Sequence, residues 1–312
     1  MKPNYPAHLK LLAFTALISL SFPIGSYITA ELNPLVVTWM RYLLASLLFI
    51  TLLVCKGQFR LPALKDLGRY TLICLPSLTY FVAMFIALGD TSALDTSALY
   101  TTVPLMSAIL AAIIFKRSTS LSISFALIGG MLGAGLIIFR GDLSAVASLS
   151  LTSSNKIFLF GCFAMALNPI AAKTLYRGES FLSMTCWTLI CATVVLTLGT
   201  STTLLATDWS AISTDVWLGI AYLAVFATAL SFFLFQQACV ALTPVQVSAY
   251  TYLIPVMVLM VNQANGHAES WSQVSYGVVT VIVAMAVMIR SSSAVSLNSP
   301  AAETPNKKQR CA

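Results

Sequence analysis

Polar side chains are scarce in this sequence, and the few that interrupt its long apolar stretches are the residues that could do chemistry. Asn168 stands near the middle of one apolar stretch, directly before Pro169, and Gln236 and Gln237 stand in another. Such a side chain is costly in an apolar environment unless it faces protein or water, so each is a candidate for holding a solute. Asn168 either lines a substrate site or makes hydrogen bonds between helices, and both interpretations are open. Adjacent glutamines point about 100° apart on a helix, so only one of them can face a narrow cavity.

Small polar residues and a proline share one helical face in two other stretches. Ser97, Thr101 and Pro104 are spaced i, i+4 and i+7, which places them on a single face. The same spacing returns in Ser248, Tyr252 and Pro255. Each proline frees a backbone carbonyl one turn earlier, and a substrate amine could use that acceptor. The matching faces predict a shared cavity wall, and the alternative is that small residues before a proline only allow close packing.

The composition places these residues in a membrane protein. With 58% hydrophobic residues, 9% charged residues and a mean hydropathy of +0.89, the chain of 312 residues carries more apolar surface than a soluble domain could bury. The net charge of +7 could indicate nucleic-acid binding, but the basic residues lie in short segments between apolar runs and not on one face. We therefore expect no nucleic-acid partner, and we expect membrane lipid around the chain.

Ten apolar runs in the sequence are long enough to cross a bilayer. A hydrocarbon core of about 30 Å needs about 20 helical residues. The runs are residues 9–30, 34–55, 70–88, 94–115, 120–139, 155–176, 182–205, 215–240, 244–263 and 271–289. The predicted fold is therefore an all-α integral membrane protein with ten transmembrane helices.

The positive charges orient these helices, because lysine and arginine accumulate in short cytoplasmic loops. With the amino terminus inside, 14 of the 17 basic residues fall on the cytoplasmic side. Acids such as Glu31, Asp90 and Asp208 fall on the outer side. We expect a multi-pass protein of the cell (inner) membrane with both termini in the cytoplasm.

One part of the sequence occurs twice. Residues 80–106 return as residues 231–257 without a gap, and Pro23 is echoed by Pro169. A repeat of five helices has an odd number of crossings, so its second copy enters the membrane from the opposite side. We predict two inverted five-helix repeats around a central cavity. The predicted segments are a cytoplasmic tail (1–8), a first repeat (9–139), an outer linker (140–154), a second repeat (155–290) and a disordered cytoplasmic tail (291–312).

The residue types do not favour an intramembrane enzyme, which remains the alternative class. A serine protease needs a histidine at membrane depth, but His8 and His267 lie outside the apolar runs. An intramembrane aspartyl protease needs two aspartates at membrane depth. A pumping ATPase needs a phosphate-binding GxxxxGKS/T motif, and the sequence contains none. The seven cysteines are scattered without a CxxC pair. We therefore expect no catalytic residues, no metal and no cofactor.

The fourth and fifth spans resemble a known family. A proline-broken fourth span is followed by the basic turn FKRSTSLS and by the glycine-rich run SFALIGGMLGAGLIIF. With the ten spans and the duplication, this pattern is similar to the EamA-type domain of the drug/metabolite transporter superfamily over residues 9–290. The resemblance implies a central cavity lined by spans one, three, four, six, eight and nine, and movement of small metabolites, often outward.

The resemblance also bears on single residues. Arg41 stands where the family has an arginine in span two, and a structural role is preferred over binding a substrate carboxylate because members with unlike substrates share it. Gln236 matches a polar position of the family and is preferred over Gln237. Tyr80 offers a ring and a hydroxyl either to the cavity or to the core. Asp95 either couples transport to protons or is an ordinary solvated charge.

These observations predict a secondary transporter that moves amino acids or related amphipathic compounds by alternating access. Export is the expected direction, and import by the same fold is the alternative.

 The predicted substrate-binding residues are Tyr80, Ser97, Tyr100, Thr101, Asn168, Gln236, Ser248 and Tyr252. The predicted helix-breaking hinges are Pro23, Pro104, Pro169 and Pro255.

Overall fold

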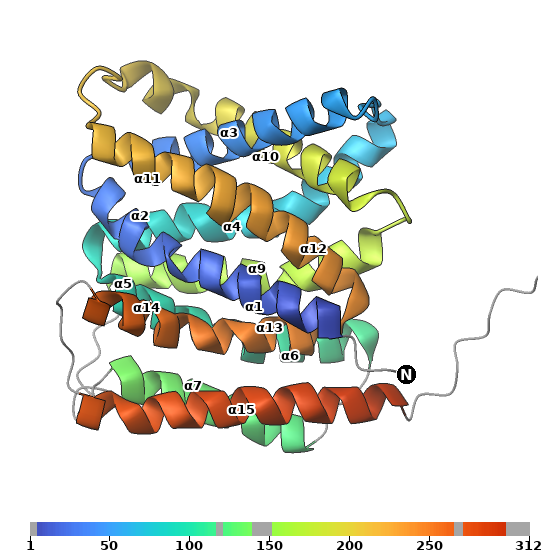
Figure 1. Ribbon diagram of the computed structural model, residues 1–312, viewed down its shortest axis with the longest axis vertical. Coiled ribbons are helices and arrows are strands. Elements are labelled where there is room, and N and C mark those ends of the chain that lie inside the picture. The colour runs from blue at the N-terminus through green and yellow to red at the C-terminus, as the bar shows by residue number, and fades with distance from the viewer. Residues whose placement is uncertain (1–4, 117–120, 139–151, 265–270, 298–312) are drawn as a thin grey trace, which may run out of the picture.

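Helices make up all of the regular structure in residues 5–116, 121–138, 152–264 and 271–297, the parts that the computed structural model describes (Figure 1). The first half holds α1 (Tyr5–Ser19), α2 (Ser21–Thr29), α3 (Pro34–Cys55), α4 (Leu64–Asp90), α5 (Ala93–Leu99), the 3₁₀ turn η1 (Tyr100–Thr102), α6 (Val103–Phe115) and α7 (Leu121–Ile138). The second half holds α9 (Ser153–Leu175), α10 (Phe181–Ala206), α11 (Thr214–Ala224), the π-helix η2 (Val225–Leu230), α12 (Ser231–Ala241), α13 (Pro244–Ala249), the 3₁₀ turn η3 (Tyr250–Tyr252), α14 (Leu253–Ala264) and α15 (Trp271–Leu297).

Seven helical segments of the described residues are long and apolar enough to cross a membrane. They are Tyr5–Thr29, Pro34–Cys55, Leu64–Asp90, Ser153–Leu175, Phe181–Ala206, Thr214–Ala241 and Pro244–Ala264. Three further apolar helices are shorter, and they are Tyr100–Phe115, Leu121–Ile137 and Ser275–Met288. This pattern is that of a multi-pass, all-α membrane protein. The count of ten crossings and the inversion of the two halves remain predictions.

Prolines and 3₁₀ turns break the helices at related places in the two halves. The turn η1 directly precedes the helix that begins with Val103 and Pro104, and the turn η3 precedes the helix that holds Pro255. A proline cannot donate the backbone hydrogen bond of a regular helix, so the chain tightens into a short turn before it. The first helical run is likewise interrupted at Leu20, between α1 and α2, shortly before Pro23. These three prolines therefore lie at or beside helix breaks.

Pro169 is a correction to the predicted set of hinges. Helix α9 continues through Pro169 without a break, as α4 continues through Pro76. Packed membrane helices tolerate a proline when neighbouring groups satisfy the backbone carbonyl that it frees. The sequence therefore identified the proline but not its effect on the helix.

The termini of the predicted segments also need correction. Helix α15 continues to Leu297, so residues 291–297 are helical and not part of a disordered tail. Helix α1 begins at Tyr5, inside the predicted tail of residues 1–8. Residues 298–312 and most of the predicted linker lie outside the described residues.

The helices run along one common direction, so the bundle has two ends (Figure 1). The basic end carries Lys10, Lys56, Arg69, Lys173 and Arg177. The acidic end carries Glu31, Asp90, Asp208 and Asp215. Contacts between distant segments close each end, and the site lies between the two ends.

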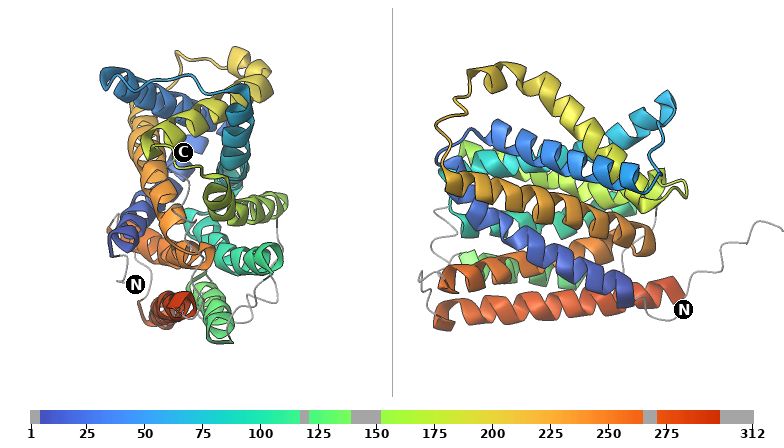
Figure 2. Two further views of the ribbon diagram at one scale, coloured as in Figure 1. Left: turned by 90° about the vertical axis from the view of Figure 1, so that its right-hand side faces the viewer. Right: turned by 45° about the horizontal axis from the view of Figure 1, so that its top comes forward.

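Helices α7 and α15 form a pair at one edge of the bundle, as the end-on view in Figure 2 shows. Glycine permits their close approach, because a Cβ at Gly277 would lie 2.6 Å from the backbone oxygen of Gly133. Small residues at a helix crossing are a common basis of helix association in membranes. The pair therefore lies outside the helices that surround the site.

Candidate functional site

A small internal cavity lies where the two halves of the chain meet. Its volume is about 10 Å³, which is roughly the space of one water molecule. Helices α3 and α4 of the first half and α9, α10 and α12 of the second half form its wall. The lining residues are Tyr42, Ile73, Cys74, Ser77, Asn168, Thr188, Leu189, Phe232 and Gln236. The structure therefore brings two of the predicted residues, Asn168 and Gln236, to one polar cavity.

Gln236 connects two helices of the second half. The Thr185 hydroxyl donates to the Gln236 side-chain oxygen over 2.7 Å, and the Gln236 amide donates to the Thr188 hydroxyl over 3.0 Å. Its neighbour Gln237 instead accepts a hydrogen bond from the Lys10 amine at the basic end. The buried glutamine at the cavity is therefore Gln236, and its bonds also hold α12 against α10.

Asn168 differs from Gln236 in its bonding. Its side chain is buried on α9 and lines the cavity. Its amide has no hydrogen bond to any other described residue. The donors and acceptor of Asn168 are therefore available to a solute or a water in the cavity.

Aromatic rings fill the neighbouring part of the core. The rings of Tyr80 and Tyr100 lie 4.7 Å apart between centroids, and Tyr80 also lies 5.6 Å from Phe158. Phe22 is 6.3 Å from Tyr100. All four rings are buried, so this part of the core has no space for a solute in the present conformation. Tyr80 and Tyr100 are therefore next to one another, but not at the wall of the cavity.

The matching faces of α5–α6 and α13–α14 lie outside the lining of the cavity that holds Asn168 and Gln236. Ser97, Thr101, Ser248 and Tyr252 are all buried, but among the described residues the cavity lining does not include them. The Tyr252 hydroxyl donates to the backbone carbonyl of Leu127 on α7 over 2.9 Å. Gly130 makes room for this ring, because a Cβ there would lie 2.5 Å from it. Tyr252 therefore attaches η3 to α7, and the shared cavity wall stays a prediction.

Arg41 is fully buried on α3 and reaches the second half of the chain. Its Nε donates to the Thr228 hydroxyl over 2.7 Å, and its Nη2 donates to the Ala227 carbonyl over 3.0 Å. Both acceptors belong to the π-helix η2, where the Thr228 hydroxyl in turn donates to the Leu223 carbonyl over 2.7 Å. The guanidinium carbon also lies 4.0 Å from the centre of the Phe81 ring. Arg41 therefore connects α3 to η2 through Nε and Nη2.

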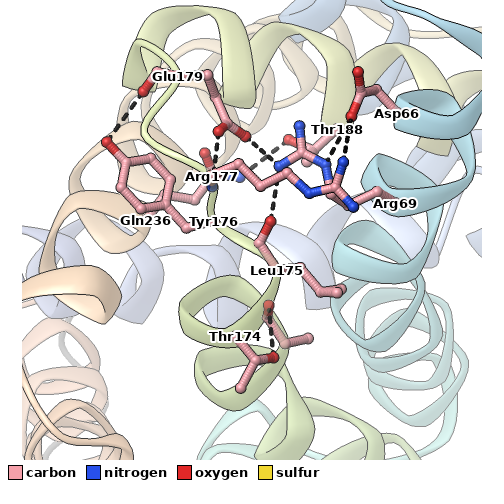
Figure 3. A network of polar contacts seen from close by, with 10 residues as sticks. Asp66, Arg69, Thr174, Leu175, Tyr176, Arg177, Glu179, Thr188 and Gln236 are labelled. Atoms are coloured by element: carbon pink, nitrogen blue, oxygen red, sulfur yellow. Dashed lines mark hydrogen bonds and ion pairs between the residues drawn. The ribbon is translucent and has the colours of Figure 1, made fainter. Parts of the chain in front are cut away.

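A network of charges closes the basic end, and Figure 3 shows it from close by. The Arg69 Nη1 donates to Glu179 over 2.6 Å and to the Leu175 carbonyl over 2.7 Å, and its Nε lies 3.2 Å from Asp66. Arg177 reaches the same Asp66 over 3.3 Å. This basic-end network joins the beginning of α4 to the loop between α9 and α10.

Several site residues were not singled out from the sequence. Tyr42 and Ser77 line the cavity, and Thr188 binds Gln236. The available signals were weak, since Tyr42 directly follows Arg41 and Thr185 stands three residues before Thr188. Hydroxyl groups are common in membrane helices, where they often bond to the backbone of their own helix. Only the packing of the neighbouring helices shows that these hydroxyl groups line the cavity or bind Gln236.

Comparison with known proteins decides the family. The EamA-like transporter family matches twice, over residues 6–139 and 153–290, once in each half of the chain. The chain belongs to the EamA-like transporter family. The predicted resemblance to the EamA-type domain of the drug/metabolite transporter superfamily is thereby confirmed. The site described above is therefore that of a membrane transporter, and the family points away from an enzyme.

Similar proteins agree with this membership. Over 282 residues, this EamA-like transporter is 26% identical to a Bacillus subtilis (strain 168) protein described as "Uncharacterized transporter YyaM", covering 88% of this chain and 91% of the relative. A solved crystal structure superposes with a TM-score of 0.71 at 12% identity, covering 92% of this chain and 98% of the other. At that identity the similarity concerns the fold alone.

Proposed function

We propose that this EamA-like transporter is a secondary transporter that moves amino acids or related amphipathic compounds out of the cell by alternating access. The observation that carries the proposal is the polar cavity that both halves line, with Asn168 and Gln236 in its wall. A cavity of about 10 Å³ is too small for such a solute, so the described conformation is closed around the site. The cavity must enlarge toward one end at a time for transport to occur.

An exchange of contacts between the halves supports inverted repeats. Glu31 precedes α3, the second long helix of the first half, and accepts a hydrogen bond over 2.9 Å from Ser213, which precedes α11. Glu179 precedes α10, the second long helix of the second half, and binds Arg69 in α4 over 2.6 Å. These two contacts lie at opposite ends of the bundle. Corresponding elements that meet at opposite ends are what a pseudo-twofold axis in the membrane plane produces.

Transport in proteoliposomes tests the proposal. Uptake and counterflow would be measured with a panel of amino acids, amines, nucleosides and aromatic compounds, with and without a pH gradient. We expect Asn168→Ala and Gln236→Ala to weaken transport of the identified solute, and Gln237→Ala to serve as the matched control outside the cavity. Thermal unfolding in detergent would show that each variant is folded. Normal transport by both cavity variants would contradict the proposed site.

Membrane sidedness is a separate part of the proposal. We place both termini in the cytoplasm of a cell with the basic end inside, because most lysines and arginines lie there. Tags on the two termini should become accessible together, and only after the cytoplasmic face is exposed. Accessibility of the two tags from opposite faces would contradict the ten crossings.

A further inference from the structure

A buried positive charge without a carboxylate partner lies beside the cavity. Arg41 is fully buried, and no Asp or Glu of the described residues lies within ion-pair distance of it. Its Nε and Nη2 have neutral acceptors on η2, but its Nη1 is buried without a hydrogen-bond partner. A charge at membrane depth is costly unless it is paired. An anion that accepts a hydrogen bond from Nη1 would therefore satisfy both the charge and the free donor of Arg41.

A second buried donor follows directly in the sequence. The hydroxyl of Tyr42 is buried without a hydrogen-bond partner of good geometry. The nearby Ser77 hydroxyl donates instead to the Cys74 carbonyl over 2.8 Å. Tyr42 lines the cavity that also contains Asn168 and Gln236. A buried hydroxyl without a hydrogen-bond partner costs free energy, and so does the buried Nη1 of Arg41. A hydrogen-bond acceptor would therefore stabilise both donors.

One aromatic side chain lies between the guanidinium and the cavity wall. The guanidinium carbon of Arg41 lies 4.0 Å from the centre of the Phe81 ring. Phe81 contacts the Tyr42 ring at 6.2 Å and the Phe232 ring at 6.0 Å between centroids, and both of these residues line the cavity. Phe81 therefore separates the guanidinium from the cavity-lining rings, and a rotation of its side chain would open the guanidinium toward the cavity.

We propose that Arg41 Nη1 and the Tyr42 hydroxyl bind the carboxylate of the transported solute. This inference rests on the proposed function and adds the chemical class of its substrate, an amphipathic compound with a carboxylate. Two donors suit the two oxygens of a carboxylate, and the positive charge opposes a substrate that carries only an amine. The rings of Phe81 and Phe232 offer an apolar surface for the remainder of the solute. Asn168 and Gln236 offer amide groups to its amine.

Matched pairs of solutes test this assignment. Counterflow would be measured for a set of amino acids from glycine to tryptophan, each beside its carboxamide, which keeps the shape but removes the negative charge. The wild type should favour the acids. Tyr42→Phe should raise KM for the acid roughly tenfold and leave KM for the amide unchanged, since it removes one hydrogen bond to a charged group. Arg41→Lys, which keeps the charge but not the fork of donors, should also reduce the preference for the acid.

The outcomes separate this inference from the proposed function. If the wild type moves amides as well as acids, or if Tyr42→Phe weakens both equally, the carboxylate assignment is wrong while transport stands. If the wild type moves no solute of the panel, the proposed function itself fails. A fold defect in Arg41→Lys does not affect the test, because Tyr42→Phe is nearly isosteric. A thermal shift of the wild type by the acid but not the amide, lost in Tyr42→Phe, would support the assignment without any measurement of transport.

Discussion

The two ends of the bundle are closed by contacts of different kinds. At the basic end, Arg69 is only 6% exposed and binds Glu179 over 2.6 Å and Asp66 over 3.2 Å. At the acidic end, the corresponding carboxylate, Glu31, accepts a single hydroxyl bond from Ser213 over 2.9 Å. A hollow of about 370 Å³, lined partly by Glu31 and Asp208, also opens at the acidic end.

This difference indicates which end opens more readily. A buried ion pair is weakly screened by salt, and breaking it leaves a charge without its partner. A hydroxyl bond to an exposed carboxylate is readily replaced by water. We therefore expect the resting protein to stay closed at the basic end, and to open first at the acidic end.

The largest expected effect comes from preventing either end from opening. In a background without native cysteines, a short bifunctional maleimide would bridge Arg69→Cys and Glu179→Cys at the basic end, or Glu31→Cys and Ser213→Cys at the acidic end. Each bridge should abolish transport, because alternating access needs both ends to open in turn. Unbridged double variants are the controls. Continued transport with a bridge in place would show that the bridged end does not move.

The next effect is on the stability of the basic end. Glu179→Gln removes the negative partner of the buried Arg69, so we expect a loss of about 2 kcal/mol in the free energy of unfolding. Opening at this end should also expose Cys74 in the cavity wall to a maleimide applied from the basic side. Thermal unfolding and the labelling rate of a variant that keeps only Cys74 measure both changes.

Glu31→Gln is the matched control at the acidic end. It alters one hydrogen bond to a hydroxyl, so we expect a loss of at most about 1 kcal/mol and no faster labelling of Cys74 from the basic side. A larger loss for Glu31→Gln than for Glu179→Gln would reverse the order of the two ends.

An exposed member of the basic-end network should matter less. Arg177 is 65% exposed and lies 3.3 Å from Asp66. Surface ion pairs contribute little and are screened by salt, so Arg177→Ala should cost about 0.5 kcal/mol or less. The comparison would be made by thermal unfolding at low and at high salt. A cost near that of Glu179→Gln would mean that the whole network, and not the buried pair, closes this end.

The smallest expected effect concerns pH at the acidic end. Hydrogen bonds from the Ser210 hydroxyl and backbone N–H lower the pKa of Asp208 from its usual value. A lowered pKa in the folded state stabilises the protein above the unfolded pKa, and this contribution is lost as pH falls through the folded pKa. Ser210→Ala removes the hydroxyl donor, so the folded-state pKa of Asp208 should rise toward its usual value and the loss of stability at acid pH should become smaller. Unfolding measured from about pH 5 to about pH 3 would show it, and identical pH profiles would contradict it.

The sequence was informative about composition and about polar residues at membrane depth. Asn168 and Gln236 could be identified as candidate cavity residues, because an amide in an apolar run is costly unless it faces protein or water. The all-α membrane class follows from apolar runs of sufficient length, and the repeated prolines mark the 3₁₀ turns before Pro104 and Pro255.

What could not be predicted depends on neighbours that are distant in sequence. Helical spacing placed Tyr252 on a face with Ser248, but only the glycine at position 130 on α7 determines where its ring lies. The partners of Arg41 are a carbonyl and a hydroxyl of the π-helix η2. No pattern of residues in the sequence predicts a π-helix there. Asp66 and Glu179 lie among the basic residues of the basic end. Counting the charges of this end does not predict that both acids pair with Arg69.

Distances across the two ends give the most direct test of alternating access between the halves. Spin labels at Lys65→Cys and Ser180→Cys would report on the basic end, and labels at Ala30→Cys and Asp215→Cys on the acidic end, each in the wild-type background and with Glu179→Gln. We predict that Glu179→Gln separates the basic-end pair while the acidic-end pair stays the same or draws closer. A basic-end distance that does not change, or a simultaneous separation at both ends, would contradict the account.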